Sequence, residues 1–281
     1  MDKAKERELK KFACQIRMDI LEEVFCARSG HPGGSLSIAD TLAYLYSELL
    51  YGDPKNPQDP QRDRFVLSKG HTAPALYAVL AEKGYFDREE LKSLRKAGAM
   101  LQGHPDMKGT PGVDMSSGSL GQGISVAVGM ALSAKLSQEA YRVYTVLGDG
   151  ELQEGQVWEA AMFAANHKLD NLIAIVDNNN LQIDGEITEV NSPYPITDKF
   201  AAFGWQVFTA DAHDFSSLEQ AFAGALATEG RPAVIVQRSV KGKGVSYMEN
   251  NVAWHGSAPN AEQYEQGMAE LKAAMEALEV E

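Results

Sequence analysis

The chain has 281 residues, of which 44% are hydrophobic and 23% are charged, as is ordinary for a globular protein. Asp and Glu number 39 against 26 Lys and Arg, and the formal charge of -13 disfavours nucleic acid as a partner. No apolar run approaches the ~20 residues that cross a bilayer, and the first residues lack a signal-peptide core. We therefore expect a cytoplasmic protein that binds no membrane.

The two cysteines agree with a reducing compartment. Cys14 and Cys26 fall within one predicted helix, about 18 Å apart along its axis. This separation is beyond the reach of a disulfide bond. We interpret both as reduced, small apolar side chains, as is usual in cytoplasmic proteins.

Helical and extended segments alternate along the chain. Apolar residues at helical spacing from Leu9 to Val24 predict a first helix that ends near Ser29, and the proline-rich residues 53–60 predict a surface loop. The other predicted helices are residues 37–50, 73–83, 88–96, 121–136, 156–167 and 216–228, and the predicted strands are residues 65–67, 142–147, 172–176, 205–209 and 233–237. This alternation predicts an α/β fold, a parallel sheet with helices on both faces. No repeat or linker interrupts it, so we expect one domain over residues 1–281.

Two polar motifs follow two of the predicted strands. Gly148-Asp149-Gly150 comes after residues 142–147, and Asp177-Asn178-Asn179-Asn180 comes after residues 172–176. The spacing is about one helix plus one parallel strand, so Asp149 and Asn179 reach the same crevice. The glycines let backbone amides approach a phosphate, and sparse oxygen donors suit Mg²⁺ shared with phosphates. A lone Gly-Asp-Gly is usually a tight turn, so the second motif is what favours a metal-diphosphate site.

Three of the six histidines lie in loops flanked by Gly or Pro, namely His31, His104 and His255. An isolated loop histidine is usually just solvated, but loops at strand ends are where catalytic groups gather. Imidazole suits proton transfer near neutral pH. His167 and His213 match no such motif, and we interpret them as surface or packing residues.

In their order along the chain, these motifs resemble the transketolase family. The matching segments are SGHPG at 29–33, DRFVLSKGH at 63–71, GHPD at 103–106, GSLGQG at 118–123, GDGELQEGQVWEAAMFAANHKLDNLIAIVDNNNLQIDG at 148–185, and HG at 255–256. The resemblance covers nearly the whole chain. It implies the thiamine diphosphate-binding fold, and within that fold the diphosphate-binding domain.

The resemblance also implies roles for individual residues. It makes Asp149, Asn179 and the backbone carbonyl of Leu181 ligands of Mg²⁺, for which Ca²⁺ or Mn²⁺ could substitute. The thiamine diphosphate contacts that it implies are His71, Gly118, Ser119, Leu120, Asp149, Gly150, Glu154, Asn179 and His255. The catalytic residues that it implies, which bind sugar hydroxyls and assist proton transfer, are His31, His104 and His255. Glu154 would join an interface network between two cofactor sites, or would simply be an acidic residue near a helix N-terminus.

Full-length transketolases continue through a pyrimidine-binding domain and a C-terminal domain, and this chain stops before both. The missing part normally supplies the glutamate that activates the cofactor. We therefore expect the N-terminal subunit of a split transketolase, which forms an α2β2 assembly with a C-terminal subunit. Helix 121–136 is rich in Gly, Ala and Ser, which indicates close packing against a neighbour. The expected reaction is ketol transfer from a ketose phosphate to an aldose phosphate.

Other interpretations stay open at this point. The chain could belong to another thiamine enzyme, of the 1-deoxyxylulose-5-phosphate synthase or 2-oxo acid dehydrogenase type, or it could be a non-catalytic regulatory subunit. His31 followed by Pro-Gly, and the motif at 103–106, favour transketolase. Lys241 and Lys243 either add positive charge near the phosphates or lie in a solvated turn.

Overall fold

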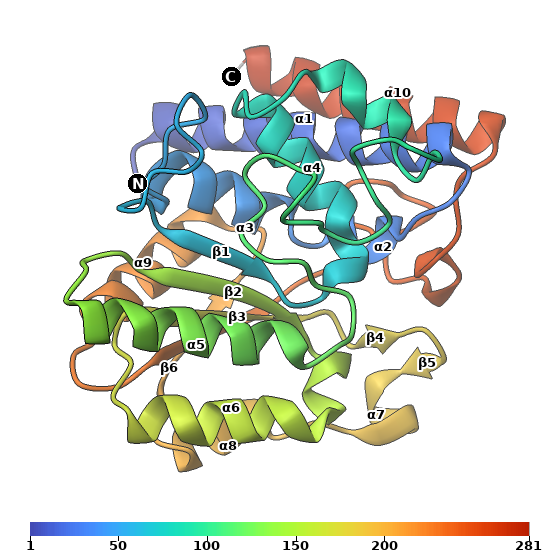
Figure 1. Cartoon of the computed structure of the whole chain (residues 1–281). Helices are drawn as coiled ribbons and strands as arrows, with labels where there is room; N and C mark the ends of the chain where they lie inside the picture. The colour runs from blue at the N-terminus through green and yellow to red at the C-terminus, as the bar shows by residue number, and fades with distance from the viewer. Residues whose placement is uncertain (281) are drawn as a thin grey trace.

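The structure is a computed structural model that describes residues 1–280. A five-stranded parallel sheet lies between two layers of helices (Figure 1). Its strands, in sheet order, are β1 (Arg64–Leu67), β2 (Val143–Gly148), β3 (Leu172–Asn178), β7 (Ala233–Arg238) and β6 (Gln206–Asp211). The predicted α/β fold with a parallel sheet is confirmed.

The two faces of the sheet fill two separate hydrophobic cores. In β3, Ile173 and Ile175 belong to one core, whereas Leu172, Ala174 and Val176 belong to the other, and all are buried. Successive side chains of a strand point to opposite faces. A strand with apolar residues at every position is therefore suited to the centre of a sheet that is covered on both sides.

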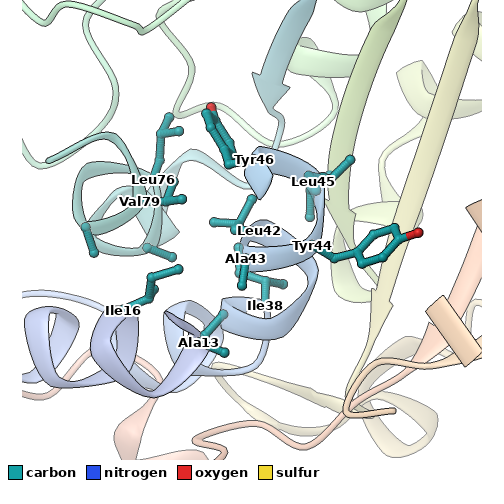
Figure 2. Close-up of a cluster of buried hydrophobic side chains, with 14 of the residues drawn as sticks. Ala13, Ile16, Ile38, Leu42, Ala43, Tyr44, Leu45, Tyr46, Leu76 and Val79 are labelled. Atoms are coloured by element: carbon teal, nitrogen blue, oxygen red, sulfur yellow. The ribbon is translucent and has the colours of Figure 1, made fainter. Parts of the chain in front are cut away.

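One core lies under a layer of helices formed mainly by the N-terminal part of the chain. This layer contains α1 (Lys3–Ala27), α2 (Pro32–Leu36), α3 (Ala39–Tyr44), α4 (Ala73–Glu82) and α9 (Phe215–Leu226), and α10 (Ala261–Val280) packs across the outside of α1 (Figure 1). Figure 2 shows where three of these helices meet: Ile16 of α1 and Leu42 of α3 lie close to Val79 of α4. The packed helices hold α2, which follows the loop that carries His31.

The other core lies under α5 (Gln122–Ser137), α6 (Gly155–Asn166) and α8 (Ile196–Ala202) (Figure 1). A small hairpin of β4 (Leu181–Gln182) and β5 (Gly185–Glu186), followed by α7 (Ile187–Asn191), lies beside the carboxyl ends of the central strands. None of the helices in the described part of the chain is long and apolar enough to cross a membrane.

Most predicted elements are confirmed to within a few residues, but two helices differ. The helix expected at residues 37–50 is α3 followed by a π-helical turn, η1 (Leu45–Leu49). The helix expected at residues 88–96 is a shorter 3₁₀ helix, η3 (Arg88–Ser93). It ends there because Arg95 adopts a left-handed backbone with φ of 60° and donates its N–H to the carbonyl of Leu101 at 2.8 Å. The hairpin, α2, α7, α8 and α10 were not predicted.

The cysteines are free thiols, as predicted. Cys14 is buried and its Sγ lies 3.2 Å from the carbonyl oxygen of Leu271 in α10, and Cys26 is half-buried. Both belong to α1, whose continuous helical backbone keeps them several turns apart.

Candidate functional site

A cavity of about 330 Å³ lies at the carboxyl ends of β1, β2, β3 and β7. The helix before β3, α6, packs on one face of the sheet, whereas the helix before β7, α9, packs on the other. Such a switch point opens a crevice outside the carboxyl ends of the strands, where α/β proteins bind ligands. The residues that line it include His31, Gly34, Lys69, His71, Gly118, Leu120, Gly148, Asp149, Gly150, Glu151, Glu154, Asn179, Leu181, Lys241 and His255.

The two polar motifs meet in this cavity. Oδ1 of Asp149 accepts the N–H of Gly150 at 2.8 Å, and Oδ2 accepts the N–H of Asn180 at 2.6 Å. The side chain of Asn179 accepts the N–H of Leu181 at 3.1 Å through Oδ1 and donates to Asp177 at 2.9 Å through Nδ2. These bonds hold the Asp149 carboxylate, the Asn179 amide and the Leu181 backbone in one group. The strand spacing predicted that Asp149 and Asn179 meet, and the resemblance implied Leu181.

Burial raises the pKa of Asp149 to about 7, with a further contribution from the negative charge of Asp177. The backbone donors at Gly150 and Asn180, and the positive charge of Lys241, act in the opposite direction. Positive charge brought close to a buried carboxyl group favours its ionised form. The site is therefore suited electrostatically to a cation.

Two buried lysines approach the same group. Lys69 is paired with Asp177 and donates to the carbonyl of Gly34 at 2.9 Å. Lys241 donates to the carbonyl of Leu181 at 3.0 Å, and burial and the charge of Lys69 lower the pKa of Lys241 to about 8. Each lysine is only 2% exposed. Lys241, which the sequence offered as a source of positive charge, follows β7, and Lys69, which sequence reasoning missed, follows β1.

Lys243 differs from Lys241. It is half-exposed and its Nζ lies 3.4 Å from Glu249, away from the residues that line the cavity. Of the two interpretations of this basic pair, positive charge in the cavity therefore fits Lys241, and a solvated turn fits Lys243.

Three histidine rings gather at one side of the cavity. The ring centroids of His31 and His71 are 5.1 Å apart, those of His71 and His255 are 5.3 Å apart, and those of His31 and His255 are 5.7 Å apart. Burial is the main cause that lowers the pKa of His31 to about 4 and of His255 to about 3, and it also holds the pKa of His71 well below its usual range. The rings are neutral near pH 7, so each can donate through one nitrogen and accept through the other.

His104 is exposed and lies at the rim of the cavity. A Cβ on Gly118, which lines the cavity, would come within 3.3 Å of the His104 ring. Burial and the charge of Arg95 lower the pKa of His104. The structure thus places His104 beside the cavity, without bringing it into the cluster of three rings.

Only part of the loop after His104 lines the cavity. Gly118 and Leu120 line the cavity, whereas Ser119 is exposed and is not among the lining residues. Glu154 also lines the cavity and immediately precedes α6, so its position agrees with both interpretations given from the sequence.

Sequence reasoning missed Glu151. Its buried carboxylate accepts the N–H of Gly121 at 2.9 Å and that of Gly148 at 3.0 Å, and it also bonds Ser68. Glu151 joins three loops at the floor of the cavity.

The remaining two histidines lie outside the site, as predicted. His213 is half-buried, with Nδ1 2.7 Å from Asp40, and its Nε2 accepts the N–H of Val240 at 2.9 Å. His167 is exposed and its ring lies 4.1 Å from that of Phe163. Both contacts are structural.

The fold and the cavity define an α/β protein that binds its ligand outside the carboxyl ends of parallel strands. A family model described as the thiamine diphosphate binding domain of transketolase matches residues 9–277. The chain therefore belongs to the transketolase family, and it corresponds to the N-terminal subunit of the two-subunit members.

Two similar relatives are single subunits of about the same length. The 6-deoxy-6-sulfo-D-fructose transketolase subunit SqwG of Clostridium sp. (strain MSTE9) is 49% identical over 257 residues, which are 92% of this chain and 94% of that protein. One subunit of the apulose-4-phosphate transketolase of Phocaeicola vulgatus is 42% identical over 265 residues, which are 94% of this chain and 94% of that protein. The match extends over almost the whole of both relatives.

Undivided transketolases match over less than half of their length. Human transketolase is 41% identical over 256 residues, which are 91% of this chain and 40% of the human protein. The crystal structure of transketolase from Campylobacter jejuni superimposes with a TM-score of 0.88 at 32% identity, and it covers 96% of this chain and 45% of that one.

Proposed function

We propose that the cavity binds the diphosphate end of thiamine diphosphate and that, with a C-terminal partner subunit, the protein transfers a ketol group from a ketose phosphate to an aldose phosphate. The observation that carries this proposal is the meeting of Asp149, Asn179, Lys241 and the histidine cluster in one cavity. Residues 1–281 would form the diphosphate-binding domain, and the partner would supply the pyrimidine-binding domain.

We propose Mg²⁺ as the metal, held by the carboxylate of Asp149, the side-chain oxygen of Asn179 and the carbonyl of Leu181, with Ca²⁺ or Mn²⁺ as substitutes. These are hard oxygen donors, and a divalent ion would offset the burial that raises the pKa of Asp149 to about 7. The described residues contain no group of three or more His, Cys, Asp or Glu that could hold a metal. That agrees with a set in which Asp149 is the sole carboxylate and phosphate oxygens complete the shell.

Different residues around the cavity would contact different parts of the cofactor. Lys241, His71 and His255 present positive charge or ring nitrogens, and Gly150 presents backbone with no side chain in the way. The proposed aminopyrimidine contacts are Gly118, Ser119 and Leu120, and of these Gly118 and Leu120 line the cavity. Bound thiamine diphosphate would stabilise the carbanion of the two-carbon unit, while the protein supplies orientation and charge.

His31, His104 and His255 would bind the donor sugar and assist proton transfer. Each neutral ring can donate an N–H group to a sugar hydroxyl, and a ring whose second nitrogen is free can accept a proton released during bond cleavage. The two relatives named for 6-deoxy-6-sulfo-D-fructose and for apulose-4-phosphate act on sugars that carry an anionic group. We propose a donor or acceptor of that kind for this protein.

The activating glutamate is expected from the partner. Two glutamates line the cavity, Glu151 and Glu154. Glu151 is already bonded to Gly121, Gly148 and Ser68. Glu154 is proposed to link two cofactor sites across an α2β2 interface. The cytoplasmic location stays a prediction.

The test is cleavage of ketose donors by the purified chain, with and without the co-expressed C-terminal subunit. We expect no turnover from the chain alone and turnover from the pair. Robust turnover by the rigorously purified chain would overturn the need for a partner. Decarboxylation of pyruvate by the pair in place of ketose cleavage would favour the 1-deoxyxylulose-5-phosphate synthase or 2-oxo acid dehydrogenase type, and an inactive pair would favour a regulatory subunit.

A further inference from the structure

Arg95 holds together the two loops that carry His31 and His104. Its Nη1 donates to Oγ of Ser29 at 3.0 Å. Its Nη2 lies 3.5 Å from the carbonyl oxygen of Gly103 and 3.4 Å from Nδ1 of His31. One guanidinium group thus contacts Ser29, two residues before His31, and Gly103, which precedes His104, and it contacts the His31 ring directly.

The local backbone is built to place this side chain. Arg95 has a φ of 60°, a conformation in which non-glycine residues are uncommon, and its N–H is bonded to the carbonyl of Leu101 at 2.8 Å. The guanidinium lies close against Gly103, where an added Cβ would come within 3.0 Å of both Cζ and Nε of Arg95. A side chain at position 103 would displace the guanidinium, so the glycine of this Gly-His-Pro-Asp motif is explained by Arg95.

We propose that Arg95 is a positioning residue that fixes the tautomer of His31, so that Nδ1 accepts from the guanidinium and Nε2 carries the proton. The guanidinium group has only donors and stays protonated. A proton on Nδ1 would face another N–H, so the proton is placed on Nε2. That nitrogen lies on the side of Gly256, where an added Cβ would be 3.6 Å away.

The charged groups around His31 also favour its neutral form. Burial is the largest cause that lowers the pKa of His31 to about 4, and the charges of Arg95, His104 and Lys241 lower it further. The two rings that pack against His31, those of His71 and His255, also have lowered pKa values. Arg95 therefore favours a neutral His31 ring as well as one tautomer of that ring.

The catalytic consequence rests on the proposed function. An Nε2–H group is a hydrogen-bond donor, so His31 would offer a donor to a sugar oxygen and would not compete for a hydroxyl proton. Loss of Arg95 would leave a mixture of tautomers, of which only a part can bind the sugar in the productive way. The effect would be on kcat more than on cofactor binding.

The direct test is nitrogen NMR of the histidine rings in ¹⁵N-histidine-labelled chain, with the His31 signals assigned through His31→Gln. In the unmodified chain we expect Nε2–H and a lowered pKa for His31. In Arg95→Met we expect mixed tautomers and a pKa closer to the usual value, whereas Arg95→Lys should keep part of the pKa shift. Lys96→Met, at the exposed neighbouring cation, is the control and should change neither. An unchanged His31 tautomer in Arg95→Met would overturn the proposal.

Gly103→Ala provides a second variant that keeps every charge and displaces the guanidinium, in case Arg95→Met is poorly folded. The same change in the His31 signals is expected, and its absence in a folded Gly103→Ala chain would contradict the proposal. With the partner present, Arg95→Met should lower kcat by less than the ~100-fold or more of removing a general acid or base, and Arg95→Lys should restore part of it. The two proposals can fail separately. If Arg95→Met changes the His31 tautomer but the unmodified chain with its partner has no ketol transfer activity, the positioning role of Arg95 stands and the proposed function is refuted.

Discussion

Nζ of Lys241 lies 2.8 Å from Nδ1 of His255. Because the same ammonium group donates to the carbonyl of Leu181 at 3.0 Å, one buried cation joins the histidine cluster to a proposed metal ligand. Lys241 reaches this position from the loop after β7, whose backbone is tied to α2 by a bond of 2.9 Å between Gly242 N–H and the carbonyl of Gly33. A cation between these groups is placed to contact a diphosphate.

Replacing Lys241 by Met is expected to weaken thiamine diphosphate binding by roughly 10-fold to 100-fold, the range of a hydrogen bond to a charged group. Isothermal titration calorimetry in the presence of magnesium measures it. Lys243→Met is the matched control, because Lys243 is two residues away and pairs with Glu249 at 3.4 Å. Equal losses in both variants would show that only general positive charge matters.

Asp149→Ala is expected to abolish or severely weaken metal-dependent binding of thiamine diphosphate. Without the carboxylate the metal loses its one charged protein ligand, and the diphosphate loses the cation that neutralises it. Calorimetric titration with and without magnesium checks this, and Asp198→Ala, on the exposed first turn of α8, serves as the control. Unchanged affinity of Asp149→Ala with magnesium present would refute the metal assignment.

Alanine at His31, His104 or His255 is expected to lower ketol transfer by the subunit pair by about 100-fold or more, with little change in Tm. The reason is that these rings face the cavity or its rim and carry few structural bonds. Steady-state kinetics and thermal unfolding are measured on each variant, with His167→Ala at the exposed end of α6 as the control. Normal turnover combined with a large loss of Tm would identify structural histidines.

The stability of the folded chain is expected to depend on pH through Glu23 in α1. Its carboxyl is fully buried, neither oxygen has a hydrogen-bond partner, and burial raises its pKa well above the usual value. Below its unfolded pKa, a carboxyl group with a raised folded pKa is protonated in both states and costs no stability. As the pH rises from the unfolded pKa toward the folded pKa, the unfolded chain releases the proton more readily, and the folded state loses stability. Glu23→Gln should therefore gain a few degrees in Tm relative to the unmodified chain between pH 5 and pH 8.

Glu22→Gln is the matched control for Glu23, because Glu22 is the adjacent residue but is half-buried, with Oε1 4.0 Å from Lys92. It should show a smaller pH-dependent gain than Glu23→Gln, because the charge of Glu22 only adds to the burial that raises the pKa of Glu23. Asp19, whose pKa burial raises to about 7, stays in place in both variants, and its charge is a further cause of the raised pKa of Glu23. If the Tm difference between Glu23→Gln and the unmodified chain is flat across this range, Glu23 does not titrate as proposed.

The sequence could predict the sheet and the meeting of Asp149 with Asn179 because both depend on local rules. Apolar runs mark the strands, and residues that follow parallel strands must arrive at the same edge. The burial of Lys69 could not be predicted in this way. Its partner Asp177 and its acceptor Gly34 are distant in sequence, and a lysine in a loop is normally solvated.

Helix α10 was not predicted, although its sequence is rich in Ala, Glu, Leu and Met, which favour a helix. It contains one glycine, Gly267, which lowers helix propensity by about 1 kcal/mol relative to alanine. In the fold this glycine allows close approach, because an added Cβ would come within 2.9 Å of Cδ2 of Leu21 in α1. The early end of η3 also depends on contacts outside the helix. The left-handed backbone of Arg95 is set by its contacts with Leu101 and Gly103 and not by local propensity.

The packing of α10 across α1 has a consequence for synthesis of the protein. The rings of Phe25 and Tyr264 stack with centroids 4.1 Å apart, so the first and last helices of the chain cover one another. At ribosomal rates of ~5 to 20 residues per second, α10 emerges roughly 10 to 50 seconds after α1. During that interval the outer face of α1 is open to chaperones and to neighbouring nascent chains, until α10 packs against it.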